Sequence, residues 1–259
     1  MRKKAIMSIS FGTKDPEIHA RNIDVLETDY RSAHPDCSLY RVITSDAVIE
    51  AYKQEGDPVY AVREAMARMV LDGVTHLYAQ PAYLLDGQEY RELWNMIYSH
   101  KADFIEVRCG TPLLYNHADI EAVVQALMQE DYADLAEDEA VVFIGHGSHH
   151  TSNAMYCALD YVFKDLGYPN AHVGTFNAFP KIDTVIHHLQ RDGIKTVHVA
   201  PFMFVAGPAA MEGVCGSAAN SMKSQLEQAG MTVIAHRKCL GEYTGIRKVF
   251  QDHLEQIMD

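Results

Sequence analysis

The sequence lacks the features that mark disulfide-rich, membrane-spanning and nucleic-acid-binding proteins. It has five cysteines and no Cys-x-x-Cys pair, so neither a disulfide framework nor a thiolate zinc site is indicated. No apolar run reaches about 18 residues, and the apolar stretch that follows Arg2, Lys3 and Lys4 is too short for a signal peptide. The 22 Lys and Arg against 35 Asp and Glu leave a formal net charge of −13, which disfavours a polyanionic partner. We therefore expect a soluble, cytoplasmic protein that binds no nucleic acid and no membrane.

Motifs for nucleotide and serine chemistry are also missing. The glycines around Gly12 and Gly147 have neither the lysine of a P-loop nor the spacing of a dinucleotide fingerprint, so no nucleotide cofactor is expected. Ser10 and Ser148 do not lie in a Gly-x-Ser-x-Gly elbow, which disfavours a serine hydrolase. What remains is a globular composition, 48% hydrophobic and 22% charged, with enough apolar material for a core in each half.

The chain contains an internal repeat. The apolar runs in residues 4–13 and 140–148 each end in a glycine-containing turn and lead into a helical pattern. Gly73–Gly87 also aligns with Gly193–Gly207 with Gly, Pro and Gly in register. Each half predicts four strands that alternate with helices, which is typical of a parallel sheet covered on both faces. We predict an α/β fold of two similar lobes, residues 1–130 and 131–259, joined by an acidic stretch and separated by a cleft.

His146 carries the strongest chemical signal. Ligands of open parallel sheets bind beyond the carboxyl ends of the strands, and His146 follows a predicted strand. Its neighbours Gly145 and Gly147 allow a tight turn that leaves the imidazole accessible, which suits a metal ligand or a general base. A capping histidine in a loop fits the same pattern. His149 and His150 either join His146 around a metal or begin the next helix.

Several short motifs, taken together, resemble one enzyme family. They are SFGT at 10–13, DGQEY at 86–90, TPLL at 111–114, GHGS at 145–148 and VAG at 205–207. In this order they are similar to the anaerobic sirohydrochlorin cobaltochelatases, the class II chelatases of the early-cobalt cobalamin pathway. The resemblance covers nearly the whole chain and implies a tetrapyrrole held between two parallel-sheet lobes. It also implies a divalent metal as substrate, cobalt first and iron or nickel as alternatives, in a lyase reaction without nucleotide.

The resemblance also assigns site residues. His146 matches the family's metal-handling histidine in the Gly-His-Gly turn, and we expect it to bind the metal and to act in catalysis together with Glu89. The expected porphyrin-binding residues lie in the loops at the strand ends: Ser10, Phe11, Gly12, Thr13, Tyr83, Gly145 and Ser148.

Three positions depart from the family pattern. Asn177 stands where the family has a glutamate, Ala209 where it has a second histidine, and Tyr83 where it has a histidine in the first lobe. One hypothesis is a chelatase in which Glu89, Glu212 or His149 substitutes. Another is a tetrapyrrole or haem-binding protein without insertion activity, with Tyr83 or His146 as axial ligand. A third is another reaction on a related macrocycle, such as metal removal. Cobalt insertion follows the whole-chain resemblance and is the function we expect; the oligomeric state stays open, a homo-oligomer included.

Overall fold

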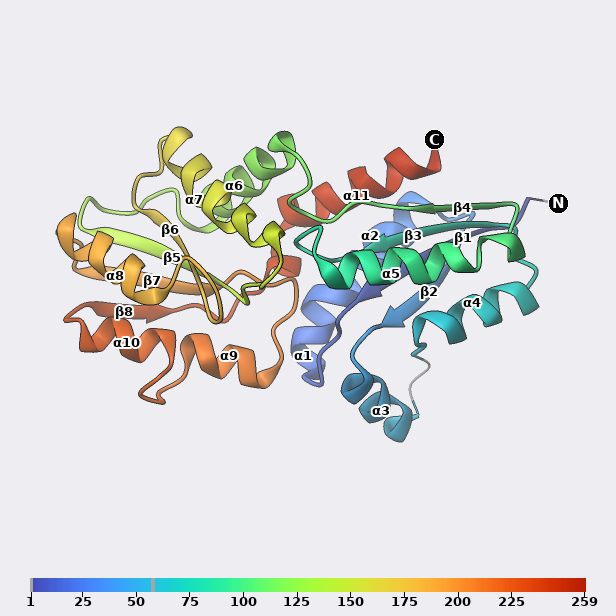
Figure 1. The fold of residues 1–259 in the computed structure, drawn as a ribbon, viewed down its shortest axis with the longest axis horizontal. Coiled ribbons are helices and arrows are strands. Elements are labelled where there is room, and N and C mark those ends of the chain that lie inside the picture. Colours follow the sequence, from blue (N-terminus) through green and yellow to red (C-terminus); the bar gives the residue numbers. More distant parts are fainter. Residues whose placement is uncertain (1, 57–58) are drawn as a thin grey trace. The chain divides into compact units, whose positions relative to one another are not determined.

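The computed structural model describes residues 2–56 and 59–259 and divides the chain into two compact units (Figure 1). Unit 1 comprises residues 1–115 and 247–259, and unit 2 comprises residues 116–246. Each unit contains a four-stranded, fully parallel sheet with helices packed against it. The predicted fold class is confirmed.

The sheet of unit 1 has the strand order β2-β1-β3-β4. Its strands are β1 (Lys4–Ser10), β2 (Ser38–Ile43), β3 (His76–Pro81) and β4 (Glu106–Cys109). The helical elements are α1 (Pro16–His19), the π-helical turn η1 (Ala20–Asp24), α2 (Val25–Ala33), α3 (Asp46–Glu55), α4 (Val62–Leu71), α5 (Gln88–Ser99), η2 (Lys101–Asp103) and the C-terminal helix α11 (Thr244–Met258). Strand β1 is buried along nearly its whole length, because helices cover both faces of a parallel sheet and its strands read as continuous apolar runs.

The sheet of unit 2 repeats this topology in the order β6-β5-β7-β8. Its strands are β5 (Glu139–Gly145), β6 (Ala171–Thr175), β7 (Thr196–Pro201) and β8 (Thr232–Ala235). The helical elements are α6 (His117–Asp131), η3 (Thr151–Asn153), α7 (Ala154–Asp165), α8 (Ile182–Arg191), α9 (Pro208–Cys215), α10 (Met222–Gln228) and η4 (Leu240–Glu242). The registers also correspond, since Ile9 lies opposite Pro81 in unit 1 and Ile144 opposite Pro201 in unit 2. The two units therefore share one strand plan, as the internal repeat predicts.

The two units do not coincide with the predicted halves 1–130 and 131–259. Helix α6 belongs to unit 2, and most of α11 belongs to unit 1 (Figure 1). Polar contacts hold α11 there: the Arg247 guanidinium lies 2.7 Å from an Asp29 carboxylate oxygen, and His253 Nδ1 lies 3.2 Å from the Thr111 carbonyl oxygen. An amphipathic pattern shows which face of a helix is buried but not which sheet buries it. The sequence pattern therefore could not reveal this exchange of helices.

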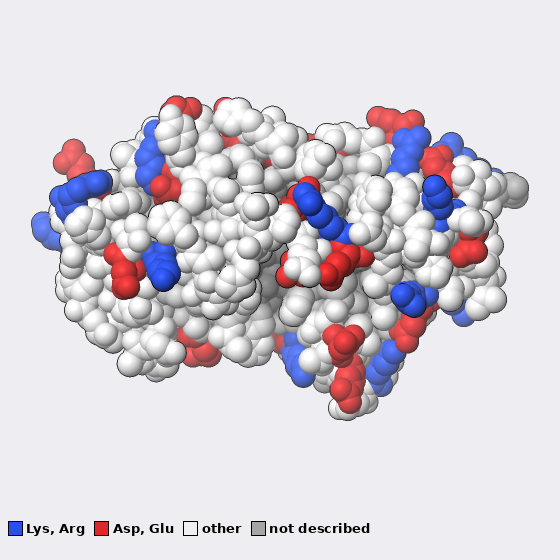
Figure 2. All heavy atoms as spheres, viewed as in Figure 1, with Lys and Arg blue, Asp and Glu red and all other residues white. Residues whose placement is uncertain are grey.

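Charged side chains of both signs lie on the surface of the protein (Figure 2). On the face shown in Figure 2, the Lys and Arg side chains lie among Asp and Glu side chains and do not gather into a basic tract. Within residues 2–56 and 59–259, no helix is long and apolar enough to cross a membrane.

Candidate functional site

His146 lies directly after β5, in a turn that its two glycine neighbours make possible. Gly147 has φ +82°, and a Cβ there would lie 3.0 Å from the backbone nitrogen of Ala178. A Cβ on Gly145 would lie 2.3 Å from the ring of Tyr156. Only glycine fits such approaches, so the turn packs tightly against its surroundings. The His146 side chain is exposed, as predicted, and its ring meets that of Phe176 edge to face at 6.4 Å between centroids.

The loop that carries His146 is bound to the loop that follows β6. The Phe176 N–H donates to the Gly145 carbonyl at 3.1 Å, and the Asn177 N–H donates to the His146 carbonyl at 3.3 Å. These bonds extend the β5–β6 pairing past the ends of the strands. Position 177 is thus adjacent to His146, and it carries an amide side chain.

Asn153 bridges the same two loops through its side chain. Its Oδ1 accepts from the Ser148 N–H at 2.9 Å, and its Nδ2 donates to the Phe179 carbonyl at 2.7 Å. One amide thereby ties the histidine loop to the loop after β6. Sequence reasoning missed Asn153, because a polar residue just before a helix reads as a local cap and its contact with Phe179 is not local.

The neighbouring histidines do not complete a metal site. His150 caps η3, because its Nδ1 accepts from the Ser152 N–H at 3.1 Å, and its own N–H donates to Ser148 Oγ at 3.1 Å. His149 is exposed. Within the part of the chain that the structure describes, no group of three or more His, Cys, Asp or Glu side chains is placed to hold a metal ion.

Helix α9 carries the positions at which the second family histidine and its suggested substitute would lie. Ala209 stands in its first turn. The face of α9 that meets Phe176 is that of Gly213, where a Cβ would lie 3.1 Å from the ring. Glu212 points about 100° away from Gly213 around the helix, and its carboxylate pairs with Arg237 at 2.8 Å. The Glu212 carboxylate therefore faces Arg237, which follows the end of β8.

In unit 1, the β1–α1 loop presents one apolar side chain. Ser10 and Thr13 are buried, whereas the Phe11 side chain is 61% exposed. Gly12 has φ +85°, and a Cβ there would lie 2.7 Å from Ile43 Cγ2, so this position requires glycine on two counts. Of the four predicted binding residues in this loop, Phe11 offers the large surface that can pack on a macrocycle.

Tyr83 and Glu89 lie at the carboxyl end of β3 and in the first turn of α5. The Tyr83 hydroxyl donates to Thr44 Oγ1 at 3.0 Å. Burial, and to a lesser extent the charge of Glu89, raise the pKa of Tyr83, so the phenolate that a metal ligand requires is disfavoured. Glu89 is exposed to solvent. The structure thus places Tyr83 against Thr44 in the strand-end loops, and its raised pKa disfavours it as an axial ligand.

The sequence of the chain matches a family of known proteins. The chain matches the family model described as cobalt chelatase (CbiK) over residues 4–259. It is 31% identical over 258 residues to sirohydrochlorin cobaltochelatase of Salmonella typhimurium, covering 99% of this chain and 97% of that protein. It is 28% identical over 256 residues to sirohydrochlorin cobaltochelatase CbiKC of Nitratidesulfovibrio vulgaris, covering 98% and 90%.

Solved structures agree on the fold. SirB from Bacillus subtilis, determined with Fe³⁺, superposes with a TM-score of 0.67 at 16% identity, covering 98% of this chain and 95% of that one. CbiX, the terminal enzyme for biosynthesis of siroheme in denitrifying bacteria, superposes with a TM-score of 0.59 at 15% identity, covering 99% and 100%. The resemblance read from the short motifs is confirmed, and the chain belongs to the CbiK cobalt chelatase family.

Proposed function

We propose that this protein inserts Co²⁺ into sirohydrochlorin in the cytoplasm, without a nucleotide cofactor. The observation that carries the proposal is the match over the whole chain to the cobalt chelatase family, with sirohydrochlorin cobaltochelatases at 28% and 31% identity. The metal and the tetrapyrrole are both substrates. Iron and nickel, which have related coordination chemistry, are alternative metals to test.

We assign metal binding to His146. An exposed imidazole at a strand end binds Co²⁺ through one nitrogen and leaves the other positions of the ion to water. Water ligands exchange for pyrrole nitrogens, so binding through a single imidazole favours transfer of the metal over retention. A metal-bound imidazole nitrogen has no lone pair left for a proton. Insertion of Co²⁺ releases two pyrrole protons, and we therefore assign the uptake of one to the exposed carboxylate of Glu89 and of the other to solvent.

One test restores the residues that the family resemblance leads us to expect at positions 177 and 209, a glutamate and a histidine. Because the Asn177 N–H donates to the His146 carbonyl, an Asn177→Glu side chain starts from the loop segment bonded to His146. We expect Asn177→Glu together with Ala209→His to tighten Co²⁺ binding at least tenfold, measured by titration calorimetry with the metal alone. If Co²⁺ affinity stays at the wild-type value, the position of this metal site is refuted.

The direct experiment follows the absorbance spectrum of sirohydrochlorin mixed with Co²⁺ and purified protein. We expect insertion faster than in the protein-free mixture and a loss of at least tenfold in rate for His146→Ala. His187→Ala, which removes an exposed histidine of α8 in the same unit, serves as the matched control and should keep the wild-type rate. Tight binding of sirohydrochlorin or haem with no acceleration would refute insertion and indicate a tetrapyrrole-binding protein.

A further inference from the structure

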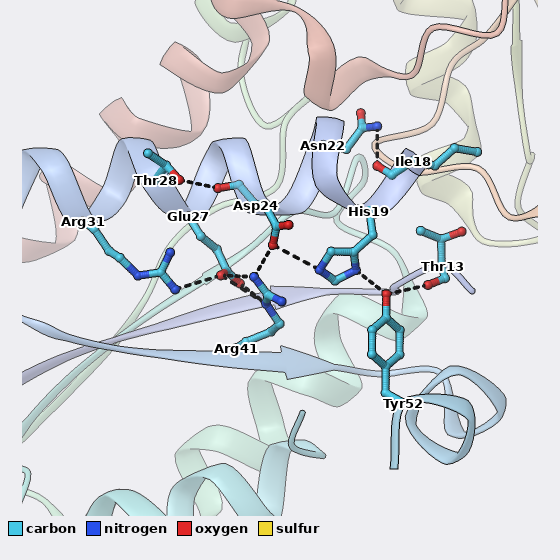
Figure 3. Close-up of polar contacts among 10 residues, drawn as sticks. All are labelled: Thr13, Ile18, His19, Asn22, Asp24, Glu27, Thr28, Arg31, Arg41 and Tyr52. Carbon is cyan, nitrogen blue, oxygen red and sulfur yellow. Dashed lines mark hydrogen bonds and ion pairs between the residues drawn. The ribbon is translucent and has the colours of Figure 1, made fainter. Parts of the chain in front are cut away.

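A chain of polar side chains connects the β1–α1 loop to the start of α2 (Figure 3). The Tyr52 hydroxyl, from α3, lies 3.1 Å from the Thr13 carbonyl oxygen and 2.6 Å from Nδ1 of His19. On the other side of the ring, His19 Nε2 lies 3.3 Å from an Asp24 carboxylate oxygen. Only 5% of the surface of His19 is exposed. The imidazole thus sits, shielded from water, between a phenol and a carboxylate.

The π-helical turn η1 makes this arrangement possible. His19 and Asp24 are five residues apart, and in an α-helix side chains at that spacing point about 140° away from each other. Hydrogen bonds of a π-helix span five residues, so residues i and i+5 lie on one face. The turn Ala20–Asp24 therefore brings the carboxylate to the imidazole. A π-helical turn inside a helix is rare and is frequently found at functional sites.

Asp24 is itself held from the neighbouring strand. The Arg41 guanidinium, on β2, forms ion pairs with both Asp24 and Glu27, and its Nη2 lies 2.7 Å from Glu27 Oε2 (Figure 3). The Glu27 side chain is 0% exposed and also pairs with Arg31 at 3.1 Å. Because burial of Glu27 and its opposite charge fix the Arg41 guanidinium, Arg41 in turn holds Asp24 beside His19.

We propose that Tyr52 and His19 are positioning residues that hold the Thr13 carbonyl, and with it the β1–α1 loop, when His19 is protonated. The Asp24 carboxylate oxygen 3.3 Å from Nε2 favours the neutral tautomer with its N–H on Nε2, because it would repel a lone pair there. In that tautomer Nδ1 accepts the Tyr52 O–H, and the Thr13 carbonyl loses that donor. Protonated His19 donates from Nδ1 to the Tyr52 oxygen, and the Tyr52 O–H then donates to Thr13. The role of this loop in tetrapyrrole binding rests on the proposed function; the protonation-dependent contact does not.

The charges around His19 define the pH range. Burial and the Arg41 guanidinium lower the pKa of His19, while Asp24 and Glu27 act in the opposite direction, and the Tyr52 hydroxyl faces Nδ1. The net direction is downward, so His19 is protonated only below the ordinary histidine range near pH 6.5. The loop is therefore held in acid and released as the pH rises towards neutrality.

The test compares Tyr52→Phe and His19→Gln with Tyr40→Phe, which removes a hydroxyl that donates to Asp72 at 2.7 Å elsewhere in unit 1. The first readout is hydrogen–deuterium exchange of peptides covering residues 8–19 between pH 5 and 8, corrected for the intrinsic pH dependence of exchange. We expect loop protection that falls with rising pH in the wild type and in Tyr40→Phe. We expect no such change in Tyr52→Phe and His19→Gln.

The second readout is the KM for sirohydrochlorin in the Co²⁺ insertion assay. Below pH 6, Tyr52→Phe should raise KM about 3- to 10-fold, as expected for one lost hydrogen bond, with kcat within twofold of the wild type. Loop exchange in Tyr52→Phe that matches the wild type at every pH would overturn the inference. A wild-type protein that neither binds nor metallates sirohydrochlorin would instead overturn the proposed function, and the exchange experiment would still decide the role of Tyr52.

Discussion

Replacing Asn153 by alanine tests whether the bridge between the loops after β5 and β6 matters for activity. The substitution removes two hydrogen bonds, one from the Ser148 N–H at 2.9 Å and one to the Phe179 carbonyl at 2.7 Å. A net contribution of about 0.5–1.5 kcal/mol for each bond gives roughly 1–2 kcal/mol for the pair, at the lower end because the site is partly exposed to water. If the loops after β5 and β6 lose this stabilisation, their active conformation becomes about 5- to 30-fold less populated.

The assay is kcat/KM for Co²⁺ insertion into sirohydrochlorin, with the melting temperature measured in parallel. We expect kcat/KM of Asn153→Ala to fall about 5- to 30-fold, and the melting temperature to fall by about 2–8 °C for a protein of this size.

Asn170→Ala is a matched control at the other end of β5. The Asn170 side chain also donates to two carbonyls, those of Glu137 at 3.2 Å and Glu139 at 3.0 Å. It should lose a similar amount of stability and keep the wild-type kcat/KM. Equal losses of activity in the two variants, or full activity in a destabilised Asn153→Ala, would show that the Asn153 bridge does not support activity.

Two further predictions concern buried ionisable groups. Arg41→Met leaves the fully buried Glu27 carboxylate without its partner on β2 and should lower the free energy of unfolding in urea by about 3–5 kcal/mol. Arg31→Met, which removes the half-exposed partner of Glu27, should cost less than about 1 kcal/mol, and equal costs would contradict this account. Burial lowers the pKa of His172 to about 4, so between pH 6.5 and 4 the unfolded chain binds more protons than the folded one. Stability should therefore fall as the pH drops through this window, by up to about 1.4 kcal/mol per pH unit from this group, and His172→Gln should flatten the curve; an unchanged slope would contradict it.

Local patterns in the chain were sufficient for the fold class and for the position of His146. The apolar runs before Gly12 and Gly147 are buried strands, and each leads into a turn in which glycine has positive φ. These signals are local, because a run of apolar residues and a glycine describe their own backbone and burial wherever the segment lies. The internal repeat then indicated that both halves follow one strand plan, and the structure confirms it.

The side-chain contacts that hold the loops could not be predicted from these local patterns. Asn153 binds Phe179 across 26 positions, and Tyr52 meets His19 across 33. The π-helical turn at Ala20–Asp24 carries no periodic signal of its own, since a single wider turn is absorbed into the surrounding helical pattern. Such pairings depend on how separate elements pack, and a pattern of apolar and polar residues does not encode the partner of an individual polar atom.

Sequence patterns alone were enough to predict two parallel-sheet units, an accessible His146 imidazole between two glycines, and membership of a chelatase family. It took the three-dimensional structure to show to which unit α6 and α11 belong, that Glu212 pairs with Arg237, and that a buried His19 reaches the loop at Thr13 through Tyr52. This difference follows from the range of the forces. Burial and backbone conformation are properties of a segment, whereas hydrogen bonds and ion pairs act over about 3 Å and depend on where the fold places the two partners.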